Sequence, residues 1–356
     1  MTISSRPLPP GATIGILGSG QLGRMLSLAA ARLGLKTHTF GPSVDDPAGQ
    51  VSHRHTQAAY DDAAALAQFG AACDAVTYEW ESIPVRAVEV SGAGRFVAPN
   101  LTALRTAQDR LLEKQFLSGL PGVDVAPFAA ASGSLQDLQR AIDTVGLPCV
   151  VKTRRGGYDG KGQAVVRQTD DITAVWDTLG SFDLIVEGFI TFSRETSVVC
   201  ARGSDGDVRA YPLTENVHRD HILHSSTAPA SGDDGTPGKI ARTIVNALDY
   251  VGVIGVEFFD TESGWIVNEI APRVHNSGHW TQDAGCTDQF EQHIRAVAGW
   301  PLGDSTPAWP VQMTNLIGND VAAWESLARE PKAHLHLYGK HTVRPGRKMG
   351  HINRRL

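Results

Sequence analysis

The sequence predicts an α/β domain followed by an α+β domain, and three observations point to this fold class. Short apolar strands alternate with helical stretches from residue 13 onward. A later block places several strands ahead of a helix and a hairpin. A chain of 356 residues is too long to fold around a single hydrophobic core, so its length indicates two or three domains.

Composition narrows the class of protein and its partners. With 42% hydrophobic and 20% charged residues, the chain resembles an ordinary soluble globular protein. A formal net charge of -6 gives no general attraction to nucleic acid or to an anionic membrane. The four cysteines are widely spaced, the start lacks a signal-peptide core, and no apolar stretch reaches the ~20 residues of a membrane span. We therefore expect a cytoplasmic protein.

The first βαβ unit begins with a strand at Thr13–Leu17 and ends with a strand at 36–40. Between them, the glycine-rich turn at 18–23 opens a helix at 24–33 and exposes backbone N–H groups, which makes it a candidate anion site. Dinucleotide-binding Rossmann domains share this motif but carry an acidic residue at the end of the second strand, where this chain has Gly41. A nicotinamide cofactor is therefore disfavoured.

The alternation continues with a helix at 61–69, a strand at Ala75–Tyr78 and a long helix at 101–117. Glu79 and Glu81 leave the strand at its carboxyl end, where open α/β sheets bind their ligands. They are candidates for a hydrogen bond to a substrate. The alternative is that both are solvated acids of a loop.

A second glycine-rich segment, at 156–162, lies between strands predicted at 149–152 and 163–167. Lys152 ends the first strand and Lys161 lies inside the loop. This arrangement fits a flap that folds over the phosphates of a nucleotide, and the alternative is a tight hairpin with surface charge. It is not a Walker A motif, which needs Gly-Lys-Ser/Thr at the start of a helix.

Antiparallel strands are predicted next at 184–190, 195–202 and 208–214, followed by a helix at 239–248. Strands and then helices within one block are typical of an α+β domain.

A β-hairpin is predicted from two apolar runs, at 255–259 and 265–270, that flank a polar turn. Counting from the turn places Glu257 opposite Asn268 or Glu269. Carboxylates that face each other across a strand pair repel, so a bound cation is expected, and oxygen-only ligands suit Mg²⁺. The alternative is that both glutamates lie on a solvated face.

The run at 273–280 leaves the hairpin and is dense in hydrogen-bond donors. It contains Arg273, His275, Asn276 and Ser277. Because these residues directly follow two candidate metal ligands, a binding site is more plausible here than isolated structural roles.

The rest of the chain is expected to form a helix at Gln289–Ala298, a linker at 301–310 and strands at 311–316 and 334–338. A basic tail follows at 339–351. It lacks interleaved aromatic residues and belongs to an acidic chain, so it fits a site for one phosphate group better than a nucleic-acid surface.

Together these stretches resemble the ATP-grasp superfamily, and within it the carboxyaminoimidazole ribonucleotide synthetases of purine synthesis. The motifs that carry the resemblance are Gly18-Ser-Gly-Gln-Leu-Gly-Arg-Met25, Gly156-Gly-Tyr-Asp-Gly-Lys-Gly162, Tyr211-Pro-Leu-Thr214, Asn268-Glu-Ile-Ala-Pro-Arg-Val-His-Asn-Ser-Gly-His-Trp280 and Val343-Arg-Pro-Gly-Arg-Lys348. They span nearly the whole chain. The run at 268–280 is long and specific, whereas many folds share the first glycine turn.

The resemblance implies an ATP-grasp fold in three domains. A doubly wound pre-ATP-grasp domain would occupy 1–105, the ATP-grasp domain 106–305, and a small β-rich C-terminal domain 306–356. It also implies a homodimer that acts on small molecules. Family members usually continue past His351 with a further short segment, whereas this chain stops at Leu356.

The resemblance further implies which residues bind ATP and Mg²⁺. The ATP contacts would be Arg110, Lys152, Gly157, Tyr158, Asp159, Gly160, Lys161, Gly162, Gln163, Glu187, Gly188, Phe189, Ile190, Glu195, His218, Asn268 and Glu269. Mg²⁺ would be held by Glu257, Glu269 and Asn268.

The implied second substrate is aminoimidazole ribonucleotide. Its contacts would be Gln21, Glu79, Tyr158, Asp159, Arg273, His275, Asn276, Ser277, Lys340 and Arg347. In the implied reaction, bicarbonate attacks the γ-phosphorus of ATP, and the resulting carboxyphosphate carboxylates the exocyclic amine. Arg273 would orient bicarbonate, and His275, Asp159 or the released phosphate would accept the amine proton.

Three other functions compete with this one. A formate-dependent ribonucleotide transformylase or a biotin carboxylase shares the fold and the metal-binding acids. A dehydrogenase rests on the first glycine turn alone. A catalytically silent nucleotide-binding protein predicts the loss of liganding acids or lysines, and none is lost from this sequence.

Overall fold

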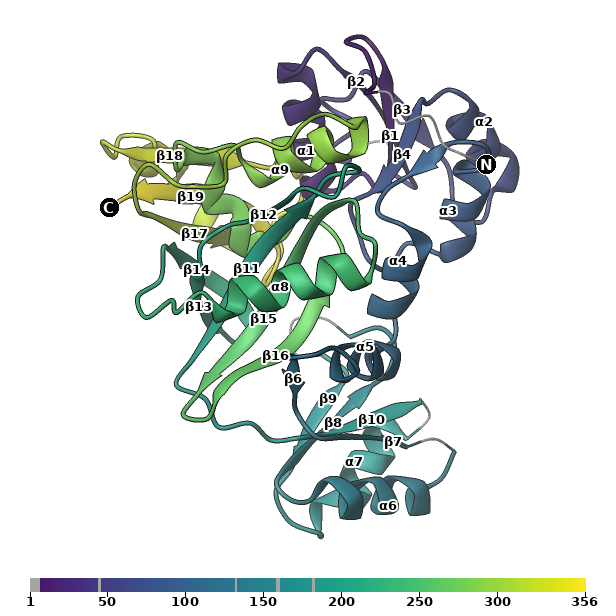
Figure 1. Ribbon diagram of the computed structural model, residues 1–356, viewed down its shortest axis with the longest axis vertical. Coiled ribbons are helices and arrows are strands. Elements are labelled where there is room, and N and C mark those ends of the chain that lie inside the picture. Colours follow the sequence, from purple (N-terminus) through teal and green to yellow (C-terminus); the bar gives the residue numbers. More distant parts are fainter. Residues whose placement is uncertain (1–6, 44–45, 132, 158–160, 181–182) are drawn as a thin grey trace.

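The computed structural model describes residues 7–43, 46–131, 133–157, 161–180 and 183–356. These residues form three β-sheets with helices packed on them (Figure 1). One sheet is N-terminal, a four-stranded sheet forms a separate lobe, and a ten-stranded sheet forms most of the remainder. No helix in these ranges is long and apolar enough to cross a membrane.

The N-terminal sheet is parallel and has the doubly wound order that the alternating pattern predicted. Its strands, in spatial order, are β3 (Arg54–Gln57), β2 (Lys36–Gly41), β1 (Thr13–Leu17), β4 (Ala75–Tyr78) and β5 (Phe96–Val97). Its helices are α1 (Gln21–Arg32), α2 (Ala63–Ala71) and α3 (Val85–Ser91). The central strands β1 and β4 are almost wholly buried, as expected of a sheet with parallel strands.

The four-stranded lobe is antiparallel and has a core of its own. Its strands are β7 (Phe128–Ala131), β10 (Leu184–Gly188), β8 (Cys149–Thr153) and β9 (Gln163–Val166). The helices α6 (Leu135–Val145) and α7 (Asp171–Leu179) share one apolar cluster with these strands. The predicted flap links β8 to β9, and its residues Tyr158, Asp159 and Gly160 lie outside the described residues.

The ten-stranded sheet runs from the middle of the chain to its C-terminal segment. Its strands, in spatial order, are β18 (Ala333–Leu337), β19 (Lys348–Arg355), β17 (Val311–Ile317), β14 (Ile222–Ala228), β13 (Thr214–Arg219), β11 (Arg194–Arg202), β15 (Gly252–Thr261), β16 (Gly264–Ala271) and β6 (Asp124–Val125), with β12 (Val208–Ala210) paired to β11. The helices in this part are α8 (Thr236–Ala247), α9 (Gln289–Ala298), α10 (Trp324–Leu327), η1 (Asn276–Asp283) and η2 (Gly318–Ala323).

Two predictions for this sheet are wrong. The strand expected at 208–214 ends at Ala210, and Thr214 begins a different strand, β13. Part of the basic tail expected at 339–351 is strand: β19 begins at Lys348 and pairs with both β17 and β18. The strands of the C-terminal segment therefore join the ten-stranded sheet.

Strand β11 shows how two helices cover opposite faces of this sheet. Val198 and Cys200 contribute to the apolar cluster that contains α8, whereas Val199 and Ala201 contribute to the cluster that contains α9. Successive side chains of a strand point to opposite faces, so this alternation places one helix on each side.

The single helix expected at 101–117 is wrong, because the chain forms α4 (Leu101–Ala107) and α5 (Arg110–Ser118) there. Asp109 separates them: its carboxylate accepts hydrogen bonds from the backbone N–H groups of Leu111 at 3.0 Å and Leu112 at 3.4 Å. It therefore caps a new helix. α5 then packs against β16 and β6 at the edge of the ten-stranded sheet.

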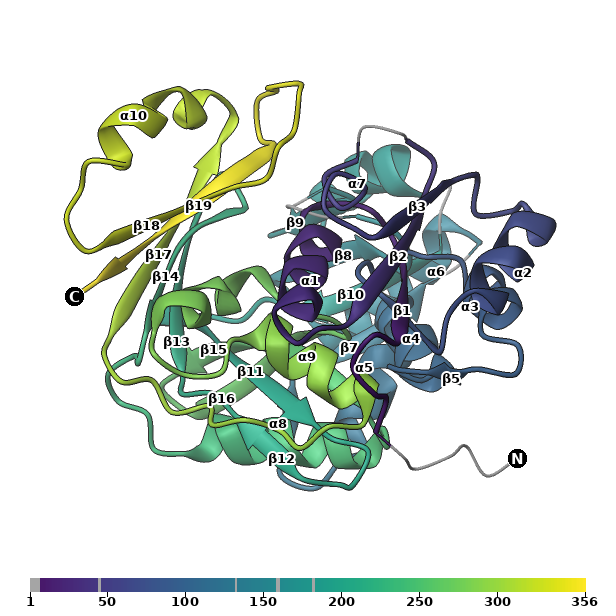
Figure 2. The ribbon, with the colours of Figure 1, turned by 90° about the horizontal axis from the view of Figure 1, so that it is seen from above.

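The N-terminal sheet and the ten-stranded sheet share one apolar core. Leu26 and Ala30 of α1 pack in the same cluster as Phe290, Ile294 and Val297 of α9. Figure 2 shows α1 beside α9 from above, with the C-terminal strands β17 to β19 on the far side of the molecule from α2 and α3. The N-terminal part is thus packed firmly onto the central sheet.

Candidate functional site

One cavity of about 1210 Å³ is lined by residues of the four-stranded and ten-stranded sheets and by the segments that follow strands β1 and β4 of the N-terminal sheet. Its walls come from the turn after β1, the loop after β4, helix α5, the loop between β8 and β9, the β15–β16 hairpin and the run that leaves this hairpin. The stretches that the sequence singled out for chemistry therefore meet at one place.

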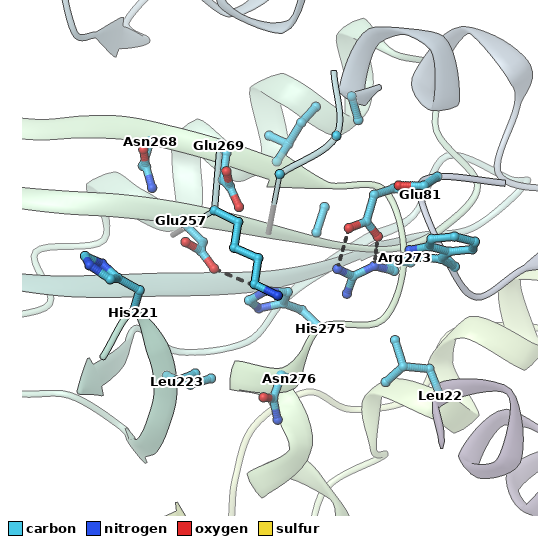
Figure 3. A pocket seen from close by; sticks show the side chains of 18 of the residues that line it. Leu22, Glu81, His221, Leu223, Glu257, Asn268, Glu269, Arg273, His275 and Asn276 are labelled. Atoms are coloured by element: carbon cyan, nitrogen blue, oxygen red, sulfur yellow. Dashed lines mark hydrogen bonds and ion pairs between the residues drawn. The ribbon is translucent and has the colours of Figure 1, made fainter. Parts of the chain in front are cut away.

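The β15–β16 hairpin brings two carboxylates face to face in this cavity (Figure 3). Glu257 pairs with Glu269, and a β-bulge follows, because Phe258 pairs with Val267 and leaves Asn268 unpaired. Of the two partners that the sequence left open for Glu257, the structure selects Glu269. Burial, and next the charge of Glu257, raises the pKa of Glu269, as expected of two acids that await a cation.

His275 lies beside Glu257 and is held from behind by a buried polar chain. Its Nε2 atom is 3.2 Å from Glu257 Oε1, and its Nδ1 atom is 2.8 Å from Ser277 Oγ. Ser197 Oγ donates to Ser277 Oγ at 2.7 Å and accepts from Asn216 Nδ2 at 2.9 Å. Burial would raise the pKa of Glu257, but the contact with His275 outweighs it and lowers that pKa.

Arg273 forms a two-point ion pair with Glu81. Figure 3 shows this pair to the right of Glu257 and Glu269. Arg273 Nη2 donates to Glu81 Oε1 at 3.0 Å, and Arg273 Nε donates to the other oxygen. Burial would lower the pKa of Arg273, but Glu81 raises it, so the guanidinium stays charged. Because Glu81 follows β4 and Arg273 follows β16, the pair joins the N-terminal sheet to the ten-stranded sheet.

Charged groups that could serve a nucleotide lie at or behind two other walls. Glu187 Oε2 is 3.0 Å from Lys152 Nζ and 3.5 Å from Lys114 Nζ. Burial would raise the pKa of Glu187, but the two lysines lower it. Glu195 Oε2 lies 2.7 Å from His218 Nδ1 on strands β11 and β13.

The glycine-rich turn at 18–23 binds a carboxylate of the protein itself. Glu79 accepts hydrogen bonds from the backbone N–H groups of Gly20 at 2.5 Å and Gly23 at 2.6 Å. A Cβ atom at Gly18 would lie 2.3 Å from Glu79 Cγ, so only glycine permits this approach. Glu79 thus occupies the donors that the pyrophosphate of a dinucleotide would use, which argues physically against a nicotinamide cofactor.

The basic tail lies beside the same part of the cavity. Lys340 Nζ donates to the backbone carbonyl of Lys348 at 2.7 Å, and Arg347 Nη1 donates to that of Thr342 at 2.7 Å. Lys348 and Tyr338 line the cavity, whereas Lys340 and Arg347 are not part of its lining.

Three family models match successive parts of the chain. A ribonucleotide synthetase preATP-grasp domain matches residues 11–108, an ATP-grasp domain matches 117–290, and a phosphoribosylaminoimidazole carboxylase C-terminal domain matches 312–355. The N5-carboxyaminoimidazole ribonucleotide synthase of Brucella melitensis is 47% identical over 354 residues, which are 98% of this chain and 97% of the relative. The chain belongs to the N5-carboxyaminoimidazole ribonucleotide synthase family.

Solved structures of this family agree with the fold described above. The synthetase from Staphylococcus aureus, complexed with ADP, has a TM-score of 0.93 at 37% identity and is matched over 99% of this chain and 95% of its own. The Aspergillus clavatus enzyme, in complex with ADP and 5-aminoimidazole ribonucleotide, has a TM-score of 0.90 at 31% identity over 98% and 94%. The predicted family, ATP-grasp fold and class of ATP-dependent ligase are confirmed. The domain boundaries at 105 and 305 stay predictions.

The cavity brings together most residues that the family resemblance implied. Its lining includes Gln21, Glu79, Arg110, Lys152, Gly157, Lys161, Gln163, Glu195, His218, Glu257, Asn268, Glu269, Arg273, His275 and Asn276. Its lining does not include Gly162, Glu187, Gly188, Phe189, Ile190, Ser277, Lys340 and Arg347. Tyr158, Asp159 and Gly160 lie outside the described ranges, so their roles stay predictions.

Glu113 and Lys114 of α5 were not among the predicted site residues. Glu113 lines the cavity, and burial, followed by the charge of Glu269, raises its pKa to about 8. Lys114 is only 1% exposed. The sequence signal for these two residues is Asp109, which is a typical helix-capping residue. A helix predicted to begin after Asp109 would have had a different buried face, one that includes Glu113 and Lys114.

Proposed function

We propose that the cavity binds ATP, bicarbonate and 5-aminoimidazole ribonucleotide together, and that the protein carboxylates the exocyclic amine of the ribonucleotide. The observation that carries the proposal is the facing pair Glu257 and Glu269 beside Arg273 and His275 in one cavity. The residues that would bind the metal and the nucleotide then share one cavity with those that would bind an anion and accept a proton. The transfer of a phosphoryl group followed by the transfer of a carboxyl group requires such an arrangement. The ligands of the Aspergillus clavatus relative support this choice of substrates.

The nucleotide would lie between the four-stranded lobe and the ten-stranded sheet. Lys152 and Arg110 line the cavity at the lobe and would neutralise its phosphates. The end of β10, from Glu187 to Ile190, would meet the adenine, and Glu195 with its partner His218 would hold the ribose. The flap between β8 and β9 would then exclude water from the phosphates.

Mg²⁺ fits the donor set of the hairpin. Glu257 and Glu269 supply two facing carboxylates, with Asn268 as a further oxygen donor in the bulge between their strands. In the described part of the chain, no cluster of three or more His, Cys, Asp or Glu side chains could hold a metal ion. This matches the usual mode of Mg²⁺, which takes its remaining ligands from phosphates and water. When bound, it would offset the negative charge that otherwise repels an anionic nucleophile.

The ribonucleotide would occupy the end of the cavity that faces the N-terminal sheet. Gln21 and Glu79 line this end, and Lys340 lies close enough to both Glu79 and Arg347 for their charges to act on it. We assign the phosphate of the ribonucleotide to these two cations and bicarbonate to Arg273. Asn276 would contact the substrate directly. Ser277 is fully buried and would act through His275.

The two transfers follow from this arrangement. An oxygen of bicarbonate attacks the γ-phosphorus of ATP, the bond to the β-phosphate oxygen breaks, and ADP leaves. The amine nitrogen then attacks the carboxyl carbon, the bond to phosphate breaks, and the amine loses a proton. His275 is the described residue best placed to accept that proton. Asp159 and the released phosphate remain the competing acceptors.

The test is ADP release with ATP, Mg²⁺ and bicarbonate, measured with and without 5-aminoimidazole ribonucleotide. We expect release to depend on the ribonucleotide, and release independent of it would refute the assignment. Glu269→Ala is expected to abolish turnover without unfolding the protein. The matched control is Glu262→Ala, an exposed acid in the turn of the same hairpin, which should keep normal activity. Near-normal turnover of Glu269→Ala would remove the metal site.

A homodimer is the expected assembly, on the strength of the family resemblance alone. Light scattering coupled to size-exclusion chromatography measures it directly, and a monomer at micromolar concentration would contradict it.

A further inference from the structure

The edge of β16 that faces away from β15 has two kinds of hydrogen-bond partner near Glu257 and Glu269: a strand and a pair of side chains. Strand β6 pairs with β16 only at Ile266 and Val267. Beyond this point the two side chains of Glu113 and Lys114 take over: Lys114 Nζ donates to the backbone carbonyl of Asn268 at 2.6 Å, and Glu113 Oε1 accepts from the backbone N–H of Ile270 at 2.7 Å. We call this pair of side chains the α5 clamp.

The α5 clamp holds the backbone on both sides of Glu269. Residues 268 and 270 present their backbone groups to the same edge of the strand, as residues two apart do in any strand. Glu269 lies between them, and its side chain meets Glu257. The bulge at Asn268 interrupts the regular ladder at this place, so strand pairing alone fixes the backbone less firmly here.

The clamp is made of two ionisable side chains that are almost inaccessible to solvent. Glu113 is 3% exposed and Lys114 is 1% exposed. Burying two ionisable groups to satisfy two backbone groups is expensive, and an ordinary sheet edge meets the same need with water or a neutral polar side chain. A purely structural role therefore explains the hydrogen bonds but not the choice of residues.

Lys114 also reaches the nucleotide side of the cavity. Its Nζ atom lies 3.5 Å from Glu187 Oε2, the oxygen that Lys152 Nζ contacts at 3.0 Å. Lys114 thus touches the metal-binding strand of the ten-stranded sheet and the end of β10 in the four-stranded lobe. It is the point where the two walls of the proposed nucleotide site are tied together.

We propose that Glu113 and Lys114 are positioning residues, which set the orientation of the Glu269 carboxylate toward the metal by holding the backbone of the β16 bulge. This inference deepens the proposed function and rests on it. Neither residue is expected to touch the metal or the reacting atoms. Their effect should appear in the metal dependence of nucleotide binding, which does not require turnover.

The experiment compares two conservative variants that separate the position of the acceptor from the presence of a carboxyl group. Glu113→Gln keeps the length of the side chain and an oxygen acceptor for the Ile270 N–H, whereas Glu113→Asp keeps the carboxyl group but withdraws the acceptor by one methylene. Calorimetric titration with ADP, in the presence and absence of Mg²⁺, gives the factor by which Mg²⁺ tightens ADP binding. Thermal unfolding of each variant confirms that it is folded. Gln115→Ala, on the exposed face of the same helix, is the matched control.

We expect Glu113→Gln and Gln115→Ala to keep the wild-type Mg²⁺ factor, and Glu113→Asp to reduce it about tenfold with little change in metal-free ADP binding. Lys114→Met should reduce the Mg²⁺ factor and also weaken metal-free binding, because Lys114 contacts Glu187. A wild-type factor in Glu113→Asp, or an equal loss in Glu113→Gln, would overturn the clamp alone. If Mg²⁺ does not tighten ADP binding by the wild type, the proposed metal site fails and the clamp fails with it.

Discussion

Lys340 is expected to change its protonation state close to physiological pH. Burial, and next the charge of Arg347, lowers its pKa to about 8, while Glu79 opposes this shift and Lys348 adds to it. A lysine that binds the phosphate of a substrate must be protonated. In the proposed phosphate site, its contribution to binding would be present below pH 8 and lost as the pH rises through that value.

This predicts that kcat/KM for 5-aminoimidazole ribonucleotide falls above a pH of about 8, with KM for ATP little changed. The variant Lys340→Arg should shift that fall to higher pH, because a guanidinium keeps its proton. Lys340→Met should have a raised KM throughout and lack the step. A step of unchanged position in Lys340→Met would contradict the assignment.

Ser277 tests how far catalysis depends on the orientation of His275. Its hydroxyl contacts His275 Nδ1 at 2.8 Å and receives a hydrogen bond from Ser197. For Ser277→Ala we predict a loss of kcat on the order of 10²-fold, because a misplaced acceptor no longer reaches the amine. KM for ATP should stay near the wild-type value. Ser263→Ala, in the exposed hairpin turn, is the control, and equal losses in both variants would contradict the prediction.

For single residues, the sequence predicted which ones belong to the candidate site better than it predicted what each one does there. Arg273, His275 and Glu269 stood out because donors and acids gather in one run of the chain. Ser197 and Asn216 did not, because a polar residue inside an apolar strand shows its purpose only when its partner from another strand is known. The pairing of Arg273 with Glu81 likewise depends on two segments far apart in sequence.

Helix α5 depends on a single residue at its start. Asp109 caps it and also binds Arg154, whose Nη2 atom donates to Oδ2 at 2.7 Å. Asp109→Ala removes both interactions and is predicted to cost about 2 to 3 kcal/mol of the free energy of unfolding. Asp109→Asn keeps the cap and should cost less. Thermal unfolding measures both, and equal losses would show that the cap contributes nothing.

The pH dependence of this contribution has a definite sign. Burial would raise the pKa of Asp109, but the hydrogen bond and the charge of Arg154 outweigh it, so the pKa is lowered on folding. The stabilisation is therefore complete above the unfolded pKa of about 3.9 and is lost as the pH falls through the lower folded value. The difference in Tm between wild type and Asp109→Asn should accordingly shrink below about pH 4. A difference that grows on acidification would contradict this.

Elements with a clear periodic pattern were predicted well, and those set by a cap or by pairing were not. The strands β1 and β4 and helix α9 have the predicted bounds, because their apolar residues follow a strand or helix period. The start of strand β19 was predicted to be part of a basic tail, because Lys348 follows other basic residues and the burial of this strand comes from β17 and β18.

At the scale of the whole molecule, the apolar clusters predict two cooperative units, while the boundaries of the three expected domains stay predictions. The N-terminal sheet and the ten-stranded sheet share one core through α1 and α9, whereas the four-stranded lobe has a separate core. Phe290→Ala in the shared core is predicted to cost about 3 to 5 kcal/mol. Hydrogen exchange should then accelerate in both β1 and α9 but not in α6.

Leu138→Ala supplies the matched comparison, because Leu138 is a fully buried residue of the four-stranded lobe. It should accelerate exchange in α6 and leave β1 protected. If Phe290→Ala loosened α9 alone, the two sheets would not be one cooperative unit. No pattern within one chain segment indicates such a shared core, so it could not be predicted from the sequence.

The carboxylate of Glu79 in the glycine-rich turn has a consequence for the selection of ligands inside a cell. NAD, NADP and FAD are abundant, and a bare turn of this kind would attract them. Here the protein supplies its own resident anion to the turn, so that a free pyrophosphate would meet repulsion in place of open donors. The same carboxylate can accept a hydrogen bond from an amine or a hydroxyl group. The glycine-rich turn is thereby closed to the pyrophosphate of these cofactors, and in the proposed function the same carboxylate lies near the amino group of the ribonucleotide.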